Sequence, residues 1–226
     1  MSLAGIHHDV TGTGPVVLFS HGFQGSSRMW TPTVAAMAAD HTAITWDILG
    51  HGRSASPDDP AAYSRAGTLD AMRGLLAGAG AGRAVLVGHS LGGYLSLDLA
   101  ITEPQLVGAL VLVDSGPGFR SATARAGWNQ FAEDSAQTAG PGIANAARGI
   151  LRQDDGHVID ALESITVPVL VVVGALDDVF LPAADYMAAR IPGASRVVID
   201  GAGHAPPVSH PAEFVAVLSP FLASLR

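Results

Sequence analysis

Short runs of valine, isoleucine and leucine recur along this chain, and segments with helical spacing lie between most of them. The apolar runs comprise residues 16–19, 43–46, 84–88, 109–114, 168–174 and 195–200. They are nearly continuous rather than alternating in polarity, which is typical of strands that helices cover on both faces. The alternation of such strands with helices predicts an α/β fold, with a mostly parallel, doubly wound sheet flanked by helices.

Segments with helical periodicity are expected at residues 31–39, 66–79, 90–101, 182–191 and 211–225. One long stretch, from about residue 119 to residue 164, has no strand pattern, and roughly 45 residues exceed what a simple connection between core elements needs. It carries an aromatic and polar piece and then an alanine-rich piece with helical character. We therefore predict a short helical cap insertion over one end of the sheet.

The composition limits both the number of domains and the kinds of chemistry. A chain of 226 residues is long enough for one large core, so we expect a single domain over residues 1–226. The formal net charge of −8 argues against nucleic acid as a partner. All basic residues are arginine, which excludes lysine Schiff bases, and the absence of cysteine excludes thiol nucleophiles and thiolate metal sites.

The N-terminal segment "MSLAGIHHDV" lacks the basic start and apolar core of a secretory signal. No apolar run reaches the length that a membrane span requires. These two observations make the cytoplasm the expected location, with a small molecule as the expected partner.

The segment "GHSLG" at residues 88–92 fits the G-x-S-x-G pattern and lies between a predicted strand and a predicted helix. On such a sharp turn the hydroxyl of Ser90 would be exposed, and the helix N-terminus would stabilise negative charge. A structural turn is the alternative interpretation of this glycine-rich pattern. The position between strand and helix favours Ser90 as a nucleophile.

A serine hydroxyl needs a general base, which in turn needs an orienting acid. In open parallel sheets such groups lie on loops at the carboxyl ends of strands. His204 follows the last predicted strand on a glycine-flanked loop, and Asp177 and Asp178 follow the strand before it. Asp114, at the end of an earlier strand, is a rival acid.

The oxyanion of an acyl-transfer reaction needs backbone donors. We expect one from the amide of Leu91, next after Ser90, and one from the amide of Phe23, after the first strong strand. The ring of Phe23 would also form an apolar wall of the substrate site. In the cap insertion, Trp128 and Phe131 are further candidates for substrate binding, although aromatic residues in a helical insertion more often serve packing.

Five motifs together resemble the α/β-hydrolase fold superfamily, and in particular its branch of small esterases, lactonases and carbon–carbon bond hydrolases. They are "HGF" at 21–23, "WDILGHGRS" at 46–54, "GHSLGG" at 88–93, "GALDDVFLP" at 174–182 and "GAGHAP" at 201–206. In that superfamily the acid lies three residues after the glycine of the fourth motif. The resemblance therefore implies a triad of Ser90, Asp177 and His204, with Asp177 favoured over Asp178.

The resemblance implies a serine hydrolase that cleaves a small, fairly apolar carboxylic ester or lactone through an acyl-enzyme, without cofactor or metal. A carbon–carbon bond hydrolase or lyase on the same triad is the main alternative. A perhydrolase, a cofactor-independent oxygenase and a ligand receptor are further ones. The first loop also resembles that of a menaquinone-pathway synthase, but Tyr94 stands where that enzyme would carry a basic residue.

Overall fold

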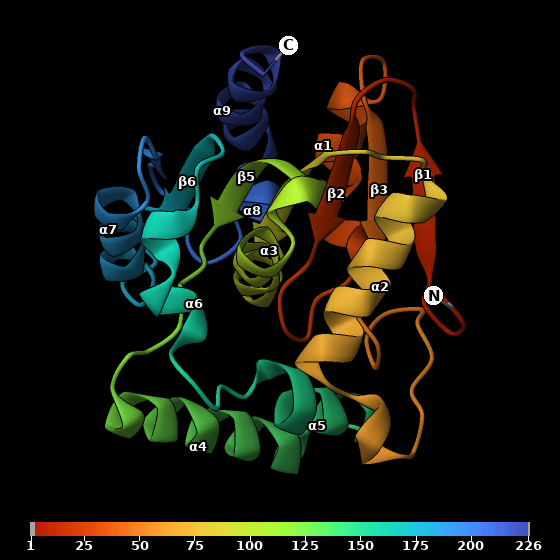
Figure 1. Cartoon of the computed structure of the whole chain (residues 1–226), viewed down its shortest axis with the longest axis vertical. Coiled ribbons are helices and arrows are strands. Elements are labelled where there is room, and N and C mark those ends of the chain that lie inside the picture. Colours follow the sequence, from red (N-terminus) through yellow and green to blue (C-terminus); the bar gives the residue numbers. More distant parts are fainter. Residues whose placement is uncertain (1–2, 226) are drawn as a thin grey trace.

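A computed structural model describes residues 3–225 and shows, within them, one sheet of seven strands in the order β1-β3-β2-β4-β5-β6-β7 (Figure 1). The strands are β1 (His8–Thr11), β2 (Val16–Ser20), β3 (Thr42–Trp46), β4 (Ala84–His89), β5 (Val107–Val113), β6 (Val169–Gly174) and β7 (Ser195–Ile199). β1 pairs antiparallel with β3, and every other pairing is parallel. The predicted α/β fold with a mostly parallel sheet is confirmed.

The helices around the sheet are α1 (Thr31–Met37), α2 (Arg65–Gly78), α3 (Leu91–Thr102), α7 (Leu181–Arg190), α8 (Pro206–Ser209) and α9 (Pro211–Ala223). Short 3₁₀ segments are η1 (Ser27–Trp30), η2 (Pro60–Ala62) and η3 (Pro104–Leu106). Among residues 3–225 there is no helix with the combination of length and apolar character that crossing a membrane would require.

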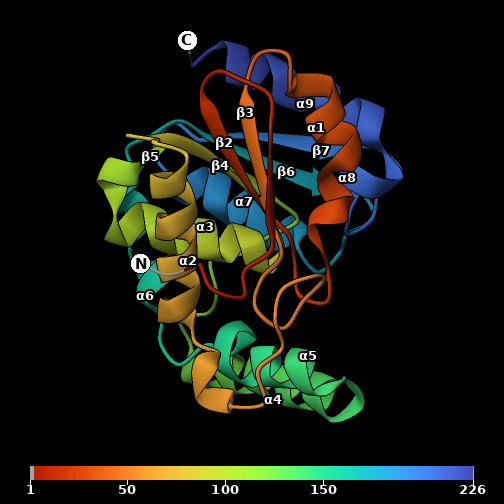
Figure 2. The ribbon, with the colours of Figure 1, turned by 90° about the vertical axis from the view of Figure 1, so that its right-hand side faces the viewer.

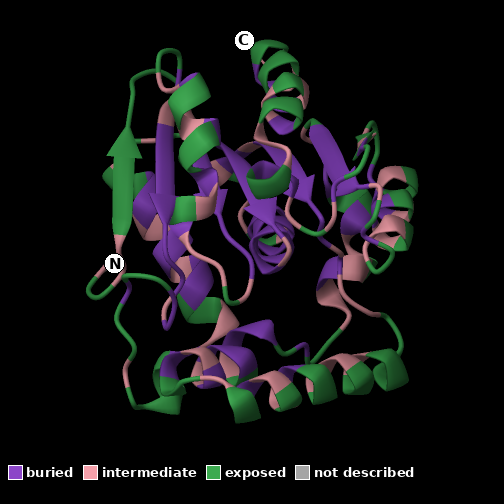
Figure 3. Ribbon diagram, turned by 180° about the vertical axis from the view of Figure 1, so that it is seen from behind, coloured by how far each residue is buried: buried purple, intermediate pink, exposed green. Residues whose placement is uncertain are grey.

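The sheet is covered on both faces because its strands are apolar on both sides. Within β2, Leu18 packs into the cluster that contains α2, α3 and α7. Its neighbours Val17 and Phe19 pack into the opposite cluster, which contains α1 and α9. Helices lie on both sides of the sheet (Figure 2), and the central strands are accordingly buried almost throughout, whereas β1 is exposed at the edge (Figure 3).

Between β5 and β6 the chain forms a separate layer, which we call the cap segment (residues 119–164; Figure 1). It contains α4 (Ala122–Thr138), α5 (Pro141–Ala146), the π-helix η4 (Ala147–Leu151), α6 (His157–Asp160) and η5 (Leu162–Ser164). Buried Asp98 of α3 links this segment to the main body through His157 Nε2 (3.2 Å). Asp98 also pairs with Arg65 Nε (3.1 Å) at the start of α2, and Arg65 in turn contacts Asp155 of the cap segment (3.2 Å).

The strand order positions the site. β2 continues to β3 on one side, but the chain then crosses to β4 on the other side of β2. In open parallel sheets the crevice for a ligand lies at such a switch point, outside the carboxyl ends of the strands. The register places Ser20 beside Gly88, so the loops that follow β2 and β4 leave the sheet at the same level.

Candidate active site

Ser90 lies on the sharp turn between β4 and α3, with φ 50° and ψ −115°. A non-glycine residue rarely adopts positive φ, and such strain persists only where neighbours hold it. Here the Ser90 amide donates to the carbonyl of Val113 (2.9 Å), and Ser115 Oγ donates to the carbonyl of Ser90 (2.7 Å). A Cβ at Gly92 would collide with the backbone of Ser20, so the close approach of this turn to β2 requires glycine.

Asp177 and His204 are brought together from the loops after β6 and β7. His204 Nδ1 lies 2.7 Å from Asp177 Oδ2. Asp177 is 7% exposed, whereas the adjacent Asp178 is exposed. The His204 ring stacks on Phe180 at 4.9 Å. A proton on Nδ1 that is donated to the carboxylate leaves Nε2 free to accept a proton, which is the tautomer that a general base requires.

Ser90 Oγ makes no hydrogen bond to any residue between 3 and 225. Gly22 packs closely against this side chain. A Cβ at Gly22 would lie 3.0 Å from Ser90 Cβ and 2.7 Å from His89 Nδ1. The chain after β2 therefore passes directly against Ser90 at Gly22, the residue before Phe23. Leu91 is the first residue of α3, and amides of the first helical turn have no partner within the helix.

Two buried histidines hold the loops around Ser90, and sequence reasoning did not assign them this role. His21 Nδ1 donates to the carbonyl of Gly22 (2.7 Å), while its Nε2 accepts from the amide of Ile48 (2.9 Å). His89 Nε2 donates to the carbonyl of His204 (2.5 Å). Burial lowers the pKa of His21 to about 3 and that of His89 to about 4, so both rings are neutral.

Asp114 lies beside Asp177 and, within residues 3–225, forms no hydrogen bond with His204. Its Oδ1 accepts from the amide of Gly174 (2.9 Å), and its buried Oδ2 has no donor among residues 3–225. Burial raises the pKa of Asp114 to about 8; the hydrogen bond from Gly174 opposes this shift, and the interaction with the neighbouring Asp177 adds to it. Asp114 is therefore neutral at pH 7, and its proton can be donated to Asp177. This arrangement gives the pair one negative charge.

Asp114, Asp177 and His204 also satisfy a distance criterion for metal ligands, since one oxygen of each carboxylate and one ring nitrogen lie within 4.8 Å of one another. The hydrogen bond between His204 Nδ1 and Asp177 Oδ2, and the one from the amide of Gly174 to Asp114 Oδ1, already hold these three side chains in place. Hydrogen bonding thus accounts for the cluster, and we assign no metal to it.

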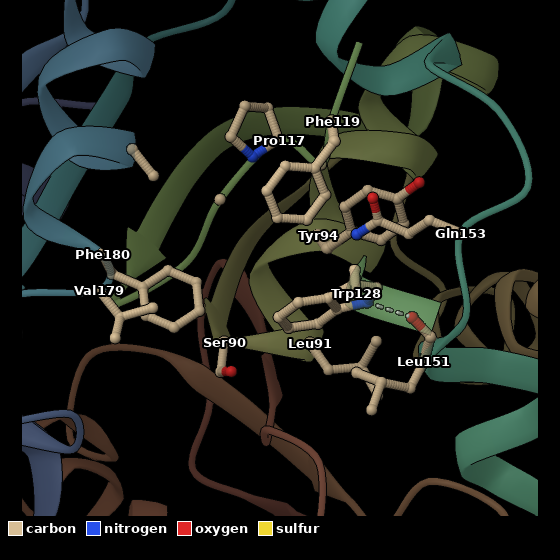
Figure 4. A pocket seen from close by; sticks show the side chains of 13 residues that line it. Ser90, Leu91, Tyr94, Pro117, Phe119, Trp128, Leu151, Gln153, Val179 and Phe180 are labelled. Carbon is tan, nitrogen blue, oxygen red and sulfur yellow. Dashed lines mark hydrogen bonds between the residues drawn. The ribbon is translucent and has the colours of Figure 1, made fainter. Parts of the chain in front are cut away.

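A mostly apolar cavity of about 210 Å³ opens beside Ser90 (Figure 4). The loop after β5, the cap segment and the start of α7 supply most of its wall. Trp128 lines the cavity, and its Nε1 donates to the carbonyl of Leu151 (2.9 Å). The lining residues are Ser90, Leu91, Tyr94, Gly116, Pro117, Gly118, Phe119, Trp128, Leu151, Gln153, Val179, Phe180 and Ala183.

Two of the aromatic candidates are not among these lining residues. Phe131 is one helical turn after Trp128 and contacts its ring at 5.3 Å, but it is 52% exposed on the outer side of α4. Phe23 packs against His51 and the cap segment instead. Sequence periodicity could place Trp128 and Phe131 near one another, but it could not distinguish the inner from the outer position.

The match to a known family extends over almost the whole chain. Residues 17–217 match the model of the alpha/beta hydrolase family, a range that contains the Ser90 turn and the Asp177–His204 pair. The chain belongs to the α/β hydrolase family. The resemblance that the five motifs indicated is therefore confirmed, and the chain is a hydrolase.

Among curated relatives of this α/β hydrolase is the pimeloyl-[acyl-carrier protein] methyl ester esterase of Nitrosomonas europaea. It is 30% identical over an alignment that covers 95% of this chain and 98% of the relative. A thermophilic esterase from Thermogutta terrifontis has a similar structure, with a TM-score of 0.86, 25% identity and coverage of 97% and 93% of the two chains. MenH from S. aureus shares the fold, with a TM-score of 0.88, 21% identity and coverage of 97% and 98%.

Proposed function

We propose that this α/β hydrolase is a serine hydrolase that cleaves small, fairly apolar carboxylic esters or lactones through an acyl-enzyme. One arrangement carries the proposal. His204 and Asp177 form a 2.7 Å hydrogen bond between loops that lie next to the strained Ser90 turn, and Ser90 lines an apolar cavity. The relatives named as esterases support the choice of an ester substrate.

In the proposed reaction, Ser90 Oγ attacks the carbonyl carbon while His204 Nε2 takes the hydroxyl proton. Asp177 keeps the imidazole in the required tautomer and stabilises the imidazolium. The backbone amides of Phe23 and Leu91 donate to the oxyanion. The bond between carbonyl carbon and leaving oxygen then breaks, and His204 gives its proton to that oxygen. Water, activated by the same histidine, attacks the acyl-enzyme and releases the acid and free Ser90.

The cavity wall supports a neutral acyl group over a charged one. None of the lining residues within 3–225 is an arginine or another charged group. A carboxylate buried there would lose its hydration without gaining a counter-charge. Esters with short alkyl or aryl acyl groups therefore fit the wall best.

Hydrolysis of p-nitrophenyl butyrate tests the proposal. We expect turnover by the wild type and a loss of about 10³-fold or more in kcat for Ser90→Ala and for His204→Ala. Ser224→Ala and His8→Ala remove the same groups at exposed positions and serve as matched controls. Unchanged turnover in Ser90→Ala would show that the chemistry lies elsewhere.

A further inference from the structure

Gln153 of the cap segment is the one uncharged amide side chain in the wall of the cavity, and it is 5% exposed. Its Oε1 is buried without a hydrogen-bond partner, and its carboxamide makes no hydrogen bond to any residue between 3 and 225. Figure 4 shows the carboxamide turned into the pocket, on the side away from Ser90. A buried carboxamide without a hydrogen-bond partner lowers the stability of the fold. A ligand that forms a hydrogen bond with the Gln153 side chain would offset that cost.

The backbone around Gln153 is built to hold it there. The Asn129 side chain of α4 forms two hydrogen bonds with the Gln153 backbone: Asn129 Nδ2 donates to its carbonyl (2.8 Å), and its amide donates to Asn129 Oδ1 (2.8 Å). Gly118 lies directly against this side chain: it has φ +84°, and a Cβ there would lie 2.6 Å from Gln153 Oε1. Glycine at 118 thus leaves the space that the carboxamide occupies.

The charge near this end of the pocket is already compensated. Arg65 Nη1 donates to the hydroxyl of Tyr94 (2.9 Å), but Arg65 also pairs with Asp98 (3.1 Å) and Asp155 (3.2 Å). Tyr94 separates this guanidinium from the cavity, and burial raises the pKa of Tyr94 to about 12, which keeps the phenol neutral. The polar group that Gln153 would bind is therefore neutral as well.

We propose that Gln153 is a specificity-determining residue, and that the acyl group of the substrate carries a neutral hydrogen-bonding group, such as a ketone, hydroxyl or amide, at its end away from the ester. The carboxamide donates to an oxygen of that group through Nε2, because Oε1 is fully buried against Gly118. Apolar walls bind the intervening methylene groups. This inference rests on the proposed esterase function and narrows its substrate class from plain alkyl esters to acyl groups with a distal polar atom.

Matched pairs of p-nitrophenyl esters test the inference: hexanoate against 5-oxohexanoate, and heptanoate against 6-oxoheptanoate. We expect kcat/KM of the wild type to favour at least one oxo ester by about tenfold or more over its alkyl partner, because the alkyl chain leaves Gln153 unpaired. In Gln153→Leu this preference should disappear, with kcat/KM for the alkyl ester retained or raised. Gln153→Met keeps the unbranched shape of the side chain and should lose the preference for the oxo ester in the same way. Gln130→Leu, the same change on the exposed side of α4, should keep the wild-type preference.

An equal oxo-to-alkyl ratio in wild type and Gln153→Leu would overturn the inference while leaving the esterase function intact. If the wild type cleaves none of these esters, the esterase proposal fails, and binding decides the role of Gln153 separately. Calorimetric titration of Ser90→Ala with 5-oxohexanamide and with hexanamide gives that readout. Tighter binding of the oxo compound that is lost in the Ser90→Ala/Gln153→Leu double variant would support Gln153, and equal binding would overturn it.

Discussion

His204 Nδ1 and Asp177 Oδ2 lie 2.7 Å apart although 27 positions separate the two residues in the chain. The hydrogen bond exists because β6 and β7 are parallel neighbours, with Gly174 paired beside Ile199, so their carboxyl-end loops leave the sheet side by side. The contact fixes which nitrogen of the imidazole is available for proton transfer.

The assignment of the acid can be tested by three aspartate variants. Asp177→Asn removes the charge next to His204 and stabilises the wrong tautomer, so we expect kcat to fall about 10⁴-fold. Asp114→Asn should keep activity within a few-fold, since the amide imitates the neutral carboxyl. Asp178→Asn changes an exposed neighbour and is the control. Equal losses in Asp114→Asn and Asp177→Asn would contradict the division of roles.

The raised pKa of Asp114 predicts a specific dependence of stability on pH. Folded Asp114 keeps its proton up to about pH 8, whereas the unfolded chain releases it near pH 3.8. This contribution to stability is therefore fully present below pH 3.8 and is lost as pH rises towards 8, by up to about 1.4 kcal/mol per pH unit. Urea unfolding should show Asp114→Asn gaining stability relative to wild type between pH 5 and 8. A difference that does not vary with pH would refute the shift.

The buried histidines act in the opposite direction at acid pH. Folded His89 resists protonation until about pH 4, whereas the unfolded residue takes up a proton near pH 6.5. Stability is thus lost as pH falls from 6.5 towards 4, by up to about 1.4 kcal/mol per pH unit for this residue. His89→Gln keeps a donor for the His204 carbonyl but does not titrate. Its stability relative to wild type should rise as pH is lowered through this range, and a constant offset would argue against a neutral His89.

Trp128 and Phe131 differ in their position on α4, and this difference should appear in kinetics. Trp128→Ala removes a cavity wall, so we expect KM for p-nitrophenyl hexanoate to rise roughly tenfold. Phe131→Ala removes a ring that is 52% exposed and should change KM by less than about threefold. Initial-rate measurements on both variants check this. A larger effect from Phe131→Ala would place the acyl group on the outer side of α4.

Sequence patterning could predict the six strands β2 to β7, because each carries a nearly continuous apolar run, which burial on both faces requires in the five central ones. β1 escaped prediction, since "HDVT" is exposed at every position and pairs only at the sheet edge. The positions of Ser90, Asp177 and His204 could be predicted because each follows a recognisable strand. The interaction of Asp114 with Asp177 could not be predicted, nor could the position of the Gln153 carboxamide, which depends on the contact with Asn129. Both contacts join residues far apart in the chain, and no local sequence pattern encodes them.

The most direct test of the central claim is to locate the site of covalent modification by a fluorophosphonate probe. Peptide mass spectrometry of the labelled wild type should find the adduct on Ser90, and labelling should be abolished in Ser90→Ala and strongly slowed in Asp177→Asn. An intact wild type that fails to label, or an adduct on another residue that persists in Ser90→Ala, would contradict the assignment of Ser90 as the activated nucleophile.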